Sequence, residues 1–247
     1  MEHRLFREAA ARYDLHTPPH HYRHDHRFVL EELSRLPPPA RVLDAGCGTG
    51  VFLERARAAG LNALGLDAAP EMVEVAERRL GPEVARLGRM QDLDDQDTWD
   101  AIVSLCWSFN YCTSLAEAGV ILEGFFRALR PGGLLILQVA HAANATGRLQ
   151  EDLEPGPGGE PDDVRFLYRF TPEPGEEPRL RARYVYACRS LNELVFEEHL
   201  LQAADVLRLA ELARKAGFGE VRTFENWHRE PFSGSLSPFL LAVRPAR

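Results

Sequence analysis

One stretch of the sequence decides the fold: Arg41-Val42-Leu43-Asp44-Ala45-Gly46-Cys47-Gly48-Thr49-Gly50-Val51-Phe52-Leu53. It opens with a short apolar run that favours a strand, continues with three glycines at alternate positions and ends in an apolar helical run. This order predicts a strand, a tight glycine-rich turn and the N-terminus of a helix. Glycine suits such a turn because it adopts positive φ and lets a ligand approach the backbone. The helix N-terminus directs free N–H groups and the positive end of its dipole at that ligand.

The spacing of the glycines separates two kinds of nucleotide-binding loop. A dinucleotide fold carries G-x-G-x-x-G, with an acidic residue about twenty positions later. Here Gly46, Gly48 and Gly50 follow one another at every second position. One acid, Asp44, opens the loop, and another, Asp67, ends the apolar run that comes next. The short loop disfavours a nicotinamide-dependent oxidoreductase, although a fold alone does not decide a function.

The composition limits the class of protein. A length of 247 residues fits one α/β domain with an insertion. The formal net charge of −8 argues against a general nucleic-acid binder, which usually presents a basic face. The four cysteines show no C-x-x-C pair and no zinc-ribbon spacing, which indicates free thiols in a reducing compartment. Because the N-terminus lacks an apolar signal core and no apolar run approaches membrane-span length, we expect a soluble, cytoplasmic protein without membrane or nucleic-acid partners.

Strands and helices alternate through the middle of the chain, as in a doubly wound α/β fold. The patterns predict strands at residues 42–45, 63–66, 84–87, 99–104 and 134–139, with helices at 50–59, 70–80 and 115–129 between them. After residue 140 the pattern changes. Residues 147–159, rich in Pro, Gly and acids, predict a mobile loop, and three strand-like runs at 164–170, 180–188 and 194–201 predict an antiparallel meander. A helix at 203–216 and strands at 221–225 and 239–243 close the chain.

The N-terminal segment is helical and rich in histidine. Five histidines stand close together before the first strand: His16, His20, His21, His24 and His26. His20 and His24 would share one face of a helix, a spacing that can bind a metal. Asp25 is near, but no cysteine or pair of carboxylates completes a ligand set. We therefore expect no metal and interpret the run as a solvated, amphipathic entry helix.

Four motifs resemble those of the class I S-adenosylmethionine (SAM) methyltransferases. They are the glycine loop, Leu64-Gly65-Leu66-Asp67 with Pro70-Glu71-Met72, the strand Trp99-Asp100-Ala101-Ile102-Val103-Ser104, and the turn Leu129-Arg130-Pro131-Gly132-Gly133-Leu134-Leu135. The resemblance implies a Rossmann-like methyltransferase fold, whose seven-stranded sheet ends in an antiparallel pair, with a small antiparallel β insertion after strand five. A narrower resemblance, through Ser108-Phe109-Asn110-Tyr111 and Tyr13-Asp14, is to sugar N,N-dimethyltransferases and glycine N-methyltransferase. It implies that the insertion caps the active site.

These likenesses divide the chain into two parts. Residues 1–140 and 202–247 would form the SAM-binding domain, of which residues 1–39 are a helical lid. Residues 141–201 would form a strand-rich insertion that caps the substrate. The family's stretch before strand four is matched by Gly88-Arg89-Met90-Gln91-Asp92, where Arg89 replaces an acid that contacts the adenine. Contacts between the adenine and the backbone of Met90 and Gln91 would be unaffected by that replacement.

The cofactor implied by the resemblance is SAM, with S-adenosylhomocysteine as product. Asp67 should accept hydrogen bonds from the ribose hydroxyls, although it could instead cap the next helix. Asp44 should order the loop, Met90 is equally well a core residue, and Ser104 ends a strand at the edge where open α/β sheets bind ligands. The full predicted set is Asp44, Gly46, Cys47, Gly48, Gly50, Asp67, Ala68, Met72, Met90, Gln91, Asp92, Ser104 and Tyr22.

The acceptor site has fewer sequence signals. Aromatic faces attract a sulfonium, and residues that either wall the methyl site or pack in the core are Trp107, Phe109, Asn110 and Tyr111. From the insertion, Tyr168 and Tyr184 could face the substrate or serve the core. His141, just after strand five, is the candidate general base or an ordinary loop histidine. Tyr13 is the second candidate for a catalytic residue, and together with Tyr22 it could close over the cofactor.

The sequence thus predicts a SAM-dependent methyltransferase that acts on a nitrogen or oxygen of a small molecule. An amine or amino sugar is the favoured acceptor, and a second copy of the chain, in a homodimer, is the other partner that we consider. Two alternatives stay open: a SAM-binding protein without catalysis, in a regulatory role, and a protein methyltransferase. A methylator of nucleic acid is disfavoured because neither Asn-Pro-Pro-Tyr nor Asp-Pro-Pro-Tyr follows strand four.

Overall fold

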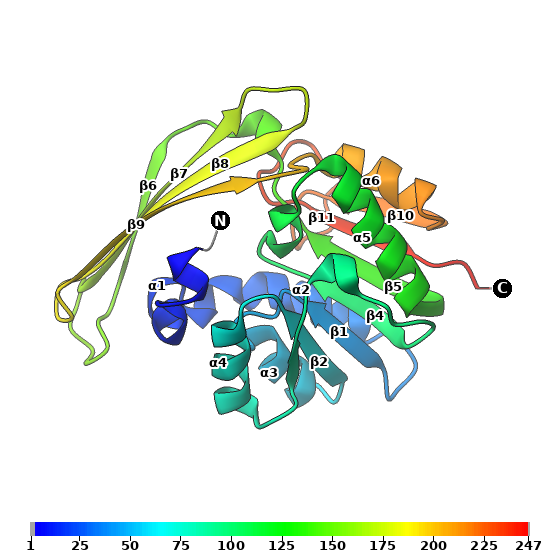
Figure 1. Ribbon diagram of the computed structural model, residues 1–247, viewed down its shortest axis with the longest axis horizontal. Coiled ribbons are helices and arrows are strands. Elements are labelled where there is room, and N and C mark those ends of the chain that lie inside the picture. The colour runs from blue at the N-terminus through cyan, green and yellow to red at the C-terminus, as the bar shows by residue number, and fades with distance from the viewer. Residues whose placement is uncertain (1–2, 247) are drawn as a thin grey trace.

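A seven-stranded sheet forms the centre of the protein (Figure 1). The structure is a computed structural model that describes residues 3–246. The strand order is β10-β11-β5-β4-β1-β2-β3. The strands are β1 (Arg41–Ala45), β2 (Asn62–Asp67), β3 (Ala85–Leu87), β4 (Trp99–Ser104), β5 (Leu129–Gln138), β10 (Glu220–Phe224) and β11 (Phe239–Val243). Only β11 runs antiparallel to its neighbours β5 and β10, and the other pairings are parallel, so the predicted doubly wound fold with a closing antiparallel pair is confirmed.

Helices cover both faces of this sheet. One face carries α5 (Leu115–Ala128) and α6 (Val206–Lys215), and the other carries α2 (Arg23–Leu33), α3 (Val51–Ala58) and α4 (Pro70–Leu80). Alternate residues of each strand serve the two cores because successive side chains of a strand point to opposite faces. In β4, for example, Ile102 packs under α5 while Val103 packs toward α2. The core strands are therefore apolar on both faces, as the sequence indicates.

A second, four-stranded antiparallel sheet stands beside the first, in the order β6-β7-β8-β9 (Figure 1). Its strands are β6 (Leu149–Glu154), β7 (Val164–Glu173), β8 (Arg179–Cys188) and β9 (Glu193–Leu201). The sheet confirms the predicted β insertion but corrects two details. The meander has four strands, and part of the expected mobile loop is β6, which pairs with β7 from Leu149↔Arg169 to Glu154↔Val164. A polar, weakly patterned segment gives little strand signal, and β6 forms because β7 offers it an open edge of N–H and C=O groups.

The N-terminal segment lies between the two sheets. It consists of η1 (Arg4–Phe6), η2 (Ala10–Arg12), α1 (Tyr13–His16), η3 (Pro19–Tyr22) and α2, so the expected helical segment is divided into short turns and one longer helix. Toward the second sheet, Arg12 pairs with Glu193. Toward the first sheet, Asp14 accepts a hydrogen bond from the Thr49 hydroxyl at 2.7 Å and pairs with Arg79 of α4. The segment is thereby tied to both sheets.

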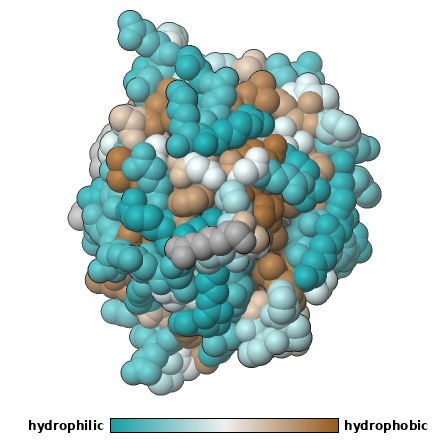
Figure 2. Space-filling model, turned by 90° about the vertical axis from the view of Figure 1, so that its right-hand side faces the viewer, coloured by the Kyte–Doolittle hydropathy of each residue, from teal (hydrophilic) through white to brown (hydrophobic). Residues whose placement is uncertain are grey.

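Hydrophilic side chains cover most of the face seen from the side of the C-terminus, with smaller apolar patches near its centre (Figure 2). Within residues 3–246, no helix combines the length and the apolar content that crossing a membrane requires. The apolar side chains are concentrated instead in the layers on either side of the first sheet.

Candidate functional site

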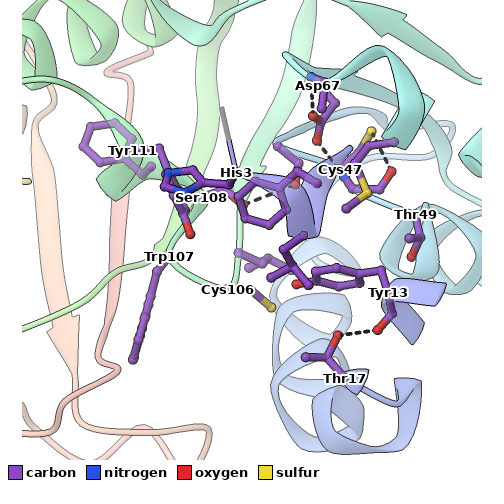
Figure 3. A pocket seen from close by; sticks show the side chains of 18 of the residues that line it. His3, Tyr13, Thr17, Cys47, Thr49, Asp67, Cys106, Trp107, Ser108 and Tyr111 are labelled. Atoms are coloured by element: carbon purple, nitrogen blue, oxygen red, sulfur yellow. Dashed lines mark hydrogen bonds between the residues drawn. The ribbon is translucent and has the colours of Figure 1, made fainter. Parts of the chain in front are cut away.

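A cavity of about 620 Å³ opens between the glycine loop, the N-terminal segment and the second sheet (Figure 3). This volume is in the range of small-molecule sites, roughly 300–1,000 Å³. The cavity lies at the carboxyl ends of β1, β2 and β4, where ligands bind in open α/β sheets. Nine of the thirteen predicted cofactor residues line it: Gly46, Cys47, Gly48, Asp67, Ala68, Met72, Met90, Gln91 and Tyr22.

The conformation of the glycine loop is fixed by the positive φ of its glycines and by a hydrogen bond to Asp67. The φ angle of Gly46 is +83°, and a Cβ built there would collide with the side chain of Ser108. Only glycine fits this close approach. The Gly48 N–H donates to Asp67 Oδ2 at 2.8 Å, and the Ala69 N–H donates to Oδ1 at 2.9 Å. Asp67 therefore joins the loop to the start of α4, and its carboxylate stands beside the cavity (Figure 3).

Asp44 lies behind the loop and not in the lining of the cavity. Its side chain is only 2% exposed. Burial, and next the charge of Asp67, raise the pKa of Asp44 to about 8. A carboxyl with this pKa is largely protonated at neutral pH, which lets two acids stand close together. The predicted ordering role agrees with this place, whereas a direct contact with a ligand in the cavity does not.

Three more predicted cofactor residues are absent from the lining formed by the described residues. A Cβ on Gly50 would lie 3.1 Å from the Ala76 Cβ, so this glycine lets α3 and α4 pack closely. Ser104 is fully buried within β4. Asp92 is exposed at the end of η4 (Met90–Asp92). These three positions correct the expectation: each stands next to a binding motif in the sequence, but none lies in the lining of the cavity.

The loop after β4 turns sharply along the cavity. Cys106 and Trp107 both adopt left-handed conformations, with φ of 50° and 64°, at a cost of order 1–3 kcal/mol each. The turn lays Trp107, Phe109 and Tyr111 along the lining, as predicted. The indole N–H of Trp107 donates to Ser237 Oγ at 3.0 Å, and its ring meets Phe170 edge to face at 5.0 Å.

Asn110 and His141 correct the predicted acceptor site. The Asn110 amide nitrogen donates to the Gln202 carbonyl at 2.9 Å, and its oxygen accepts from Ala140 N at 2.8 Å. This fully buried side chain fastens the ends of β5 and β9 together. The predicted general base, His141, is buried outside the cavity, and its Nδ1 accepts from Val206 N at 3.3 Å. Burial lowers the pKa of His141, and its ring supports the start of α6.

The second sheet presents an aromatic wall to the cavity. Alternate residues of β7 and β8 point inward because a strand has a period of two, and the wall consists of Phe166, Tyr168, Phe170, Tyr184 and Tyr186. The rings of Phe166 and Tyr186 stack across the strands at 4.5 Å. The predicted substrate residues Tyr168 and Tyr184 both belong to the wall. Electron-rich faces of this kind attract cations.

A buried hydrogen-bonded chain runs from the second sheet to the cavity. His199 Nε2 lies 2.7 Å from Glu197 Oε2, and His199 Nδ1 lies 2.5 Å from the Tyr111 hydroxyl. Glu197 also accepts from Leu5 N at 2.9 Å. Burial opposes ionisation of Glu197, but the hydrogen bonds from His199 and Leu5 outweigh it and lower its pKa. The carboxylate only accepts, so Nε2 carries the imidazole proton and Nδ1 accepts from Tyr111.

The sequence reasoning missed Glu197 and His199. A signal was present: along β9, Val195, Glu197, His199 and Leu201 occupy the inward positions and all are buried. Two polar residues on the inward face of a strand need partners. The nature of the partner could not be foreseen, because Tyr111 is 88 residues away in the sequence.

Tyr13 and Tyr22 line the cavity from the N-terminal segment, as predicted. Burial raises the pKa of Tyr13 to about 12, although its interactions with Thr17 and Tyr22 oppose the rise. Burial also raises the pKa of Tyr22 well above its usual value, so both phenols stay protonated and act as hydrogen-bonding groups. Asp14, the residue after Tyr13, accepts a hydrogen bond from Thr49, which ties this part of the N-terminal segment to the glycine loop.

Comparison with known proteins agrees with the fold and the loop. Residues 19–221 match the model of a family described as "Methyltransferase domain". The chain belongs to this family, and its class I SAM-dependent methyltransferase fold, predicted from the motifs, is confirmed. The cofactor of this class is SAM.

Two curated relatives and one solved structure illustrate the kinds of methyltransferase that this chain is similar to. The chain is 32% identical to the dTDP-4-amino-2,3,4,6-tetradeoxy-D-glucose N,N-dimethyltransferase of Saccharopolyspora spinosa over 42% of each chain. It is 35% identical to the malonyl-[acyl-carrier protein] O-methyltransferase of Serratia marcescens over 46% of this chain and 42% of that one. The matched region thus spans less than half of either relative. The SAM-bound structure of CalS10, an amino pentose methyltransferase from Micromonospora echinaspora, superposes with a TM-score of 0.71 at 25% identity, covering 89% of this chain and 90% of that one.

Proposed function

We propose that this protein transfers a methyl group from SAM to a nitrogen or oxygen of a small-molecule acceptor, and that the acceptor is an amine or amino sugar. The observation that carries the proposal is a single cavity with two unlike ends. The glycine loop and Asp67 line one end, and the aromatic wall with Tyr111 and His199 lines the other. A cofactor site and an acceptor site in one enclosure are what a direct transfer needs.

The first end fits the cofactor. The Asp67 carboxylate can accept two hydrogen bonds from vicinal ribose hydroxyls, and the glycine loop leaves its backbone open to a ligand. Met90 and Gln91 line the same end, where they can cover an adenine. Bound SAM supplies an electrophilic methyl group on a sulfonium. The tasks of the chain are to hold the acceptor in line, exclude water and take up a proton.

The second end can take up that proton. Burial raises the pKa of Tyr111 well above its usual value, so the phenol does not ionise by itself. It can pass its proton to His199 Nδ1 while it accepts one from the acceptor, and Glu197 stabilises the imidazolium that results. In this scheme Tyr111 contacts the acceptor, and Glu197 and His199 position it.

An amine is favoured over the alternatives by the aromatic wall, since such rings attract an ammonium group. The sugar N,N-dimethyltransferase relative supports this choice, and the malonyl-[acyl-carrier protein] O-methyltransferase relative keeps oxygen acceptors in the set to be tested. A protein acceptor would have to reach Tyr111 between the N-terminal segment and the second sheet. A SAM-binding protein without catalysis would retain the first end only.

The test is production of S-adenosylhomocysteine, measured by mass spectrometry, with SAM and a panel of amines, nucleotide-linked amino sugars, hydroxylated analogues and acyl-carrier-protein thioesters. We expect turnover with at least one amino compound, and a methylated product with one or two added methyl masses. Tyr111→Phe serves as the matched control, because it removes only the hydroxyl. Binding of SAM without turnover across the panel would favour the non-catalytic alternative. Methylation of a protein and of no small molecule in the panel would favour a protein methyltransferase.

A further inference from the structure

We infer that His20, His21 and Glu154 form a binding site for a divalent transition-metal ion, such as Zn²⁺, at the edge of the cavity. His21 Nε2 lies 2.8 Å from Glu154 Oε1, and His20 Nε2 lies 3.3 Å from the same oxygen. The three potential ligand atoms are all within 4.8 Å of one another. None of these three residues is among the predicted cofactor and acceptor residues, although His21 lines the same cavity.

The tertiary structure brings these groups together from two distant segments. His20 and His21 stand in η3 of the N-terminal segment, and Glu154 is the last residue of β6, 133 residues beyond His21. Sequence reasoning paired His20 with His24, but the His24 ring stacks on Trp227 at 5.1 Å. The carboxylate that the histidine run lacked in the sequence is thus supplied by the second sheet.

The distances suit a tetrahedral metal site. Zinc bonds to imidazole nitrogen and carboxylate oxygen at about 2.0–2.2 Å, which places tetrahedral ligand atoms roughly 3.3 Å apart. The two separations from Glu154 Oε1, 2.8 and 3.3 Å, are close to this value. The imidazole ligand atoms lie within 4.8 Å of each other, so a bound ion requires a small adjustment of the two rings. Two imidazoles and one carboxylate favour zinc, cobalt or nickel over magnesium or calcium, which prefer oxygen ligands. The His20 side chain is half exposed, so water has access to the fourth position.

The position of the site suggests what a bound ion would do to the N-terminal segment. His21 itself lines the cavity, and so does Asp152, two residues before Glu154. The following residue of η3 is Tyr22, which also lines the cavity. A metal bound here would join the N-terminal segment to the edge strand of the second sheet and so restrain the segment over the cavity. Removing the ion would release that restraint.

A second group among the described residues has a similar composition: His3, Glu197 and His199. There, Glu197 and His199 are already bonded to each other, and Glu197 also accepts from Leu5 N. The His3 ring lies against the His199 ring with centroids 3.8 Å apart and the planes tilted by 33°. Both nitrogen atoms of His199 are already engaged, Nε2 by Glu197 and Nδ1 by Tyr111, so neither is free for a metal ion. We therefore assign the metal to the exposed group.

The experiment uses the full chain without a histidine tag, freed of metal by a chelator and titrated with Zn²⁺ by calorimetry. Co²⁺, whose visible absorption reports tetrahedral nitrogen and oxygen ligands, is the second probe. We expect one site per chain, with affinity at least tenfold lower in Glu154→Gln and in His21→Ala. His24→Ala is the matched control from the same run, and Glu197→Gln tests the buried group. Both should bind as the unchanged protein does.

Equal Zn²⁺ affinity in Glu154→Gln and the unchanged protein, or an equal loss in His24→Ala, would overturn the assignment. Loss in Glu197→Gln alone would move the metal to the buried group. The restraint is tested separately by the dissociation rate of S-adenosylhomocysteine in stopped flow. Zn²⁺ should slow this rate severalfold in the unchanged protein and not in Glu154→Gln, and an unchanged rate would remove the restraint while leaving the metal site.

Discussion

The hydroxyl oxygen of Tyr111 lies 2.5 Å from Nδ1 of His199, across the boundary between the two sheets. Tyr111 belongs to η5 (Ser108–Tyr111), in the loop after β4 of the first sheet, and His199 belongs to β9 of the insertion. Their contact joins the loop after β4 to the insertion and places an imidazole nitrogen beside the Tyr111 hydroxyl. Glu197, at 2.7 Å from the other nitrogen, sets the tautomer that this contact requires.

Tyr111→Phe should therefore lower kcat by about 10²–10⁴-fold, the range for loss of a general acid–base group, while SAM affinity stays within about twofold. Glu197→Gln should lower kcat and shift the pH–rate profile, because an amide no longer holds His199 in the required tautomer. Calorimetry with SAM and initial rates with the acceptor found in the panel check both variants. Unchanged rates in Tyr111→Phe would remove the chain of hydrogen bonds from the mechanism and leave SAM binding intact.

Asp67→Ala should weaken SAM binding by about 1–3 kcal/mol, because charge-assisted hydrogen bonds to the ribose are lost. The Gly48 and Ala69 N–H groups also lose their acceptor. Asp67→Asn keeps an acceptor oxygen without the charge, so its affinity for SAM should lie between those of the unchanged protein and Asp67→Ala. Calorimetric titration with SAM measures all three proteins, and an affinity unaltered in Asp67→Ala would place the ribose elsewhere.

Two glycines of the loop should respond differently to alanine. A Cβ on Gly46 collides with Ser108, whereas a Cβ on Gly48 meets no atom within 4 Å. Both have positive φ, which costs an alanine about 1 kcal/mol. Gly46→Ala should be destabilised by more than that, and Ser108→Gly in the same chain should restore part of the loss. Denaturant unfolding gives the comparison, and a Gly48→Ala protein destabilised as much as Gly46→Ala would contradict it.

Asp44 should make the ligand-free protein less stable as the pH rises. Its pKa in the folded protein, about 8, lies above the ordinary value of 3.8. The unfolded chain therefore loses this proton first, and the stability present below about pH 4 falls until the folded group also ionises near pH 8. Because a tenfold change in acidity corresponds to about 1.4 kcal/mol, the loss of stability is at most about 6 kcal/mol.

Asp44→Asn removes this titration. We expect the variant to be more stable than the unchanged protein at pH 8 and to lose less stability between pH 5 and pH 8. Urea unfolding at several pH values measures the difference. Parallel curves for the two proteins would show that Asp44 is ionised in the folded state.

Local patterns predicted much of the fold. The strand Trp99–Ser104 has the bounds that its apolar run indicates, and β1, β2 and β11 differ by only one residue at either end or not at all. The glycine loop and the position of Asp67 at the end of a strand were also predicted, because glycine spacing and strand ends can be recognised from a few neighbouring residues. Weakly patterned segments were harder. β6 was interpreted as a loop because its pairing partner, and not its own residues, makes it a strand.

The sequence by itself determined the class of fold, the succession of strands and helices along the chain and the glycine loop, since hydrophobic period, glycine positions and strand ends are local properties of the chain. Only the tertiary structure decided which polar side chains meet. It took Asn110 and His141 out of the acceptor site, joined Tyr111 to His199, and set Glu154 against His20 and His21. Contacts of this kind depend on how two sheets and an N-terminal segment pack together, and packing orients side chains that the sequence leaves free.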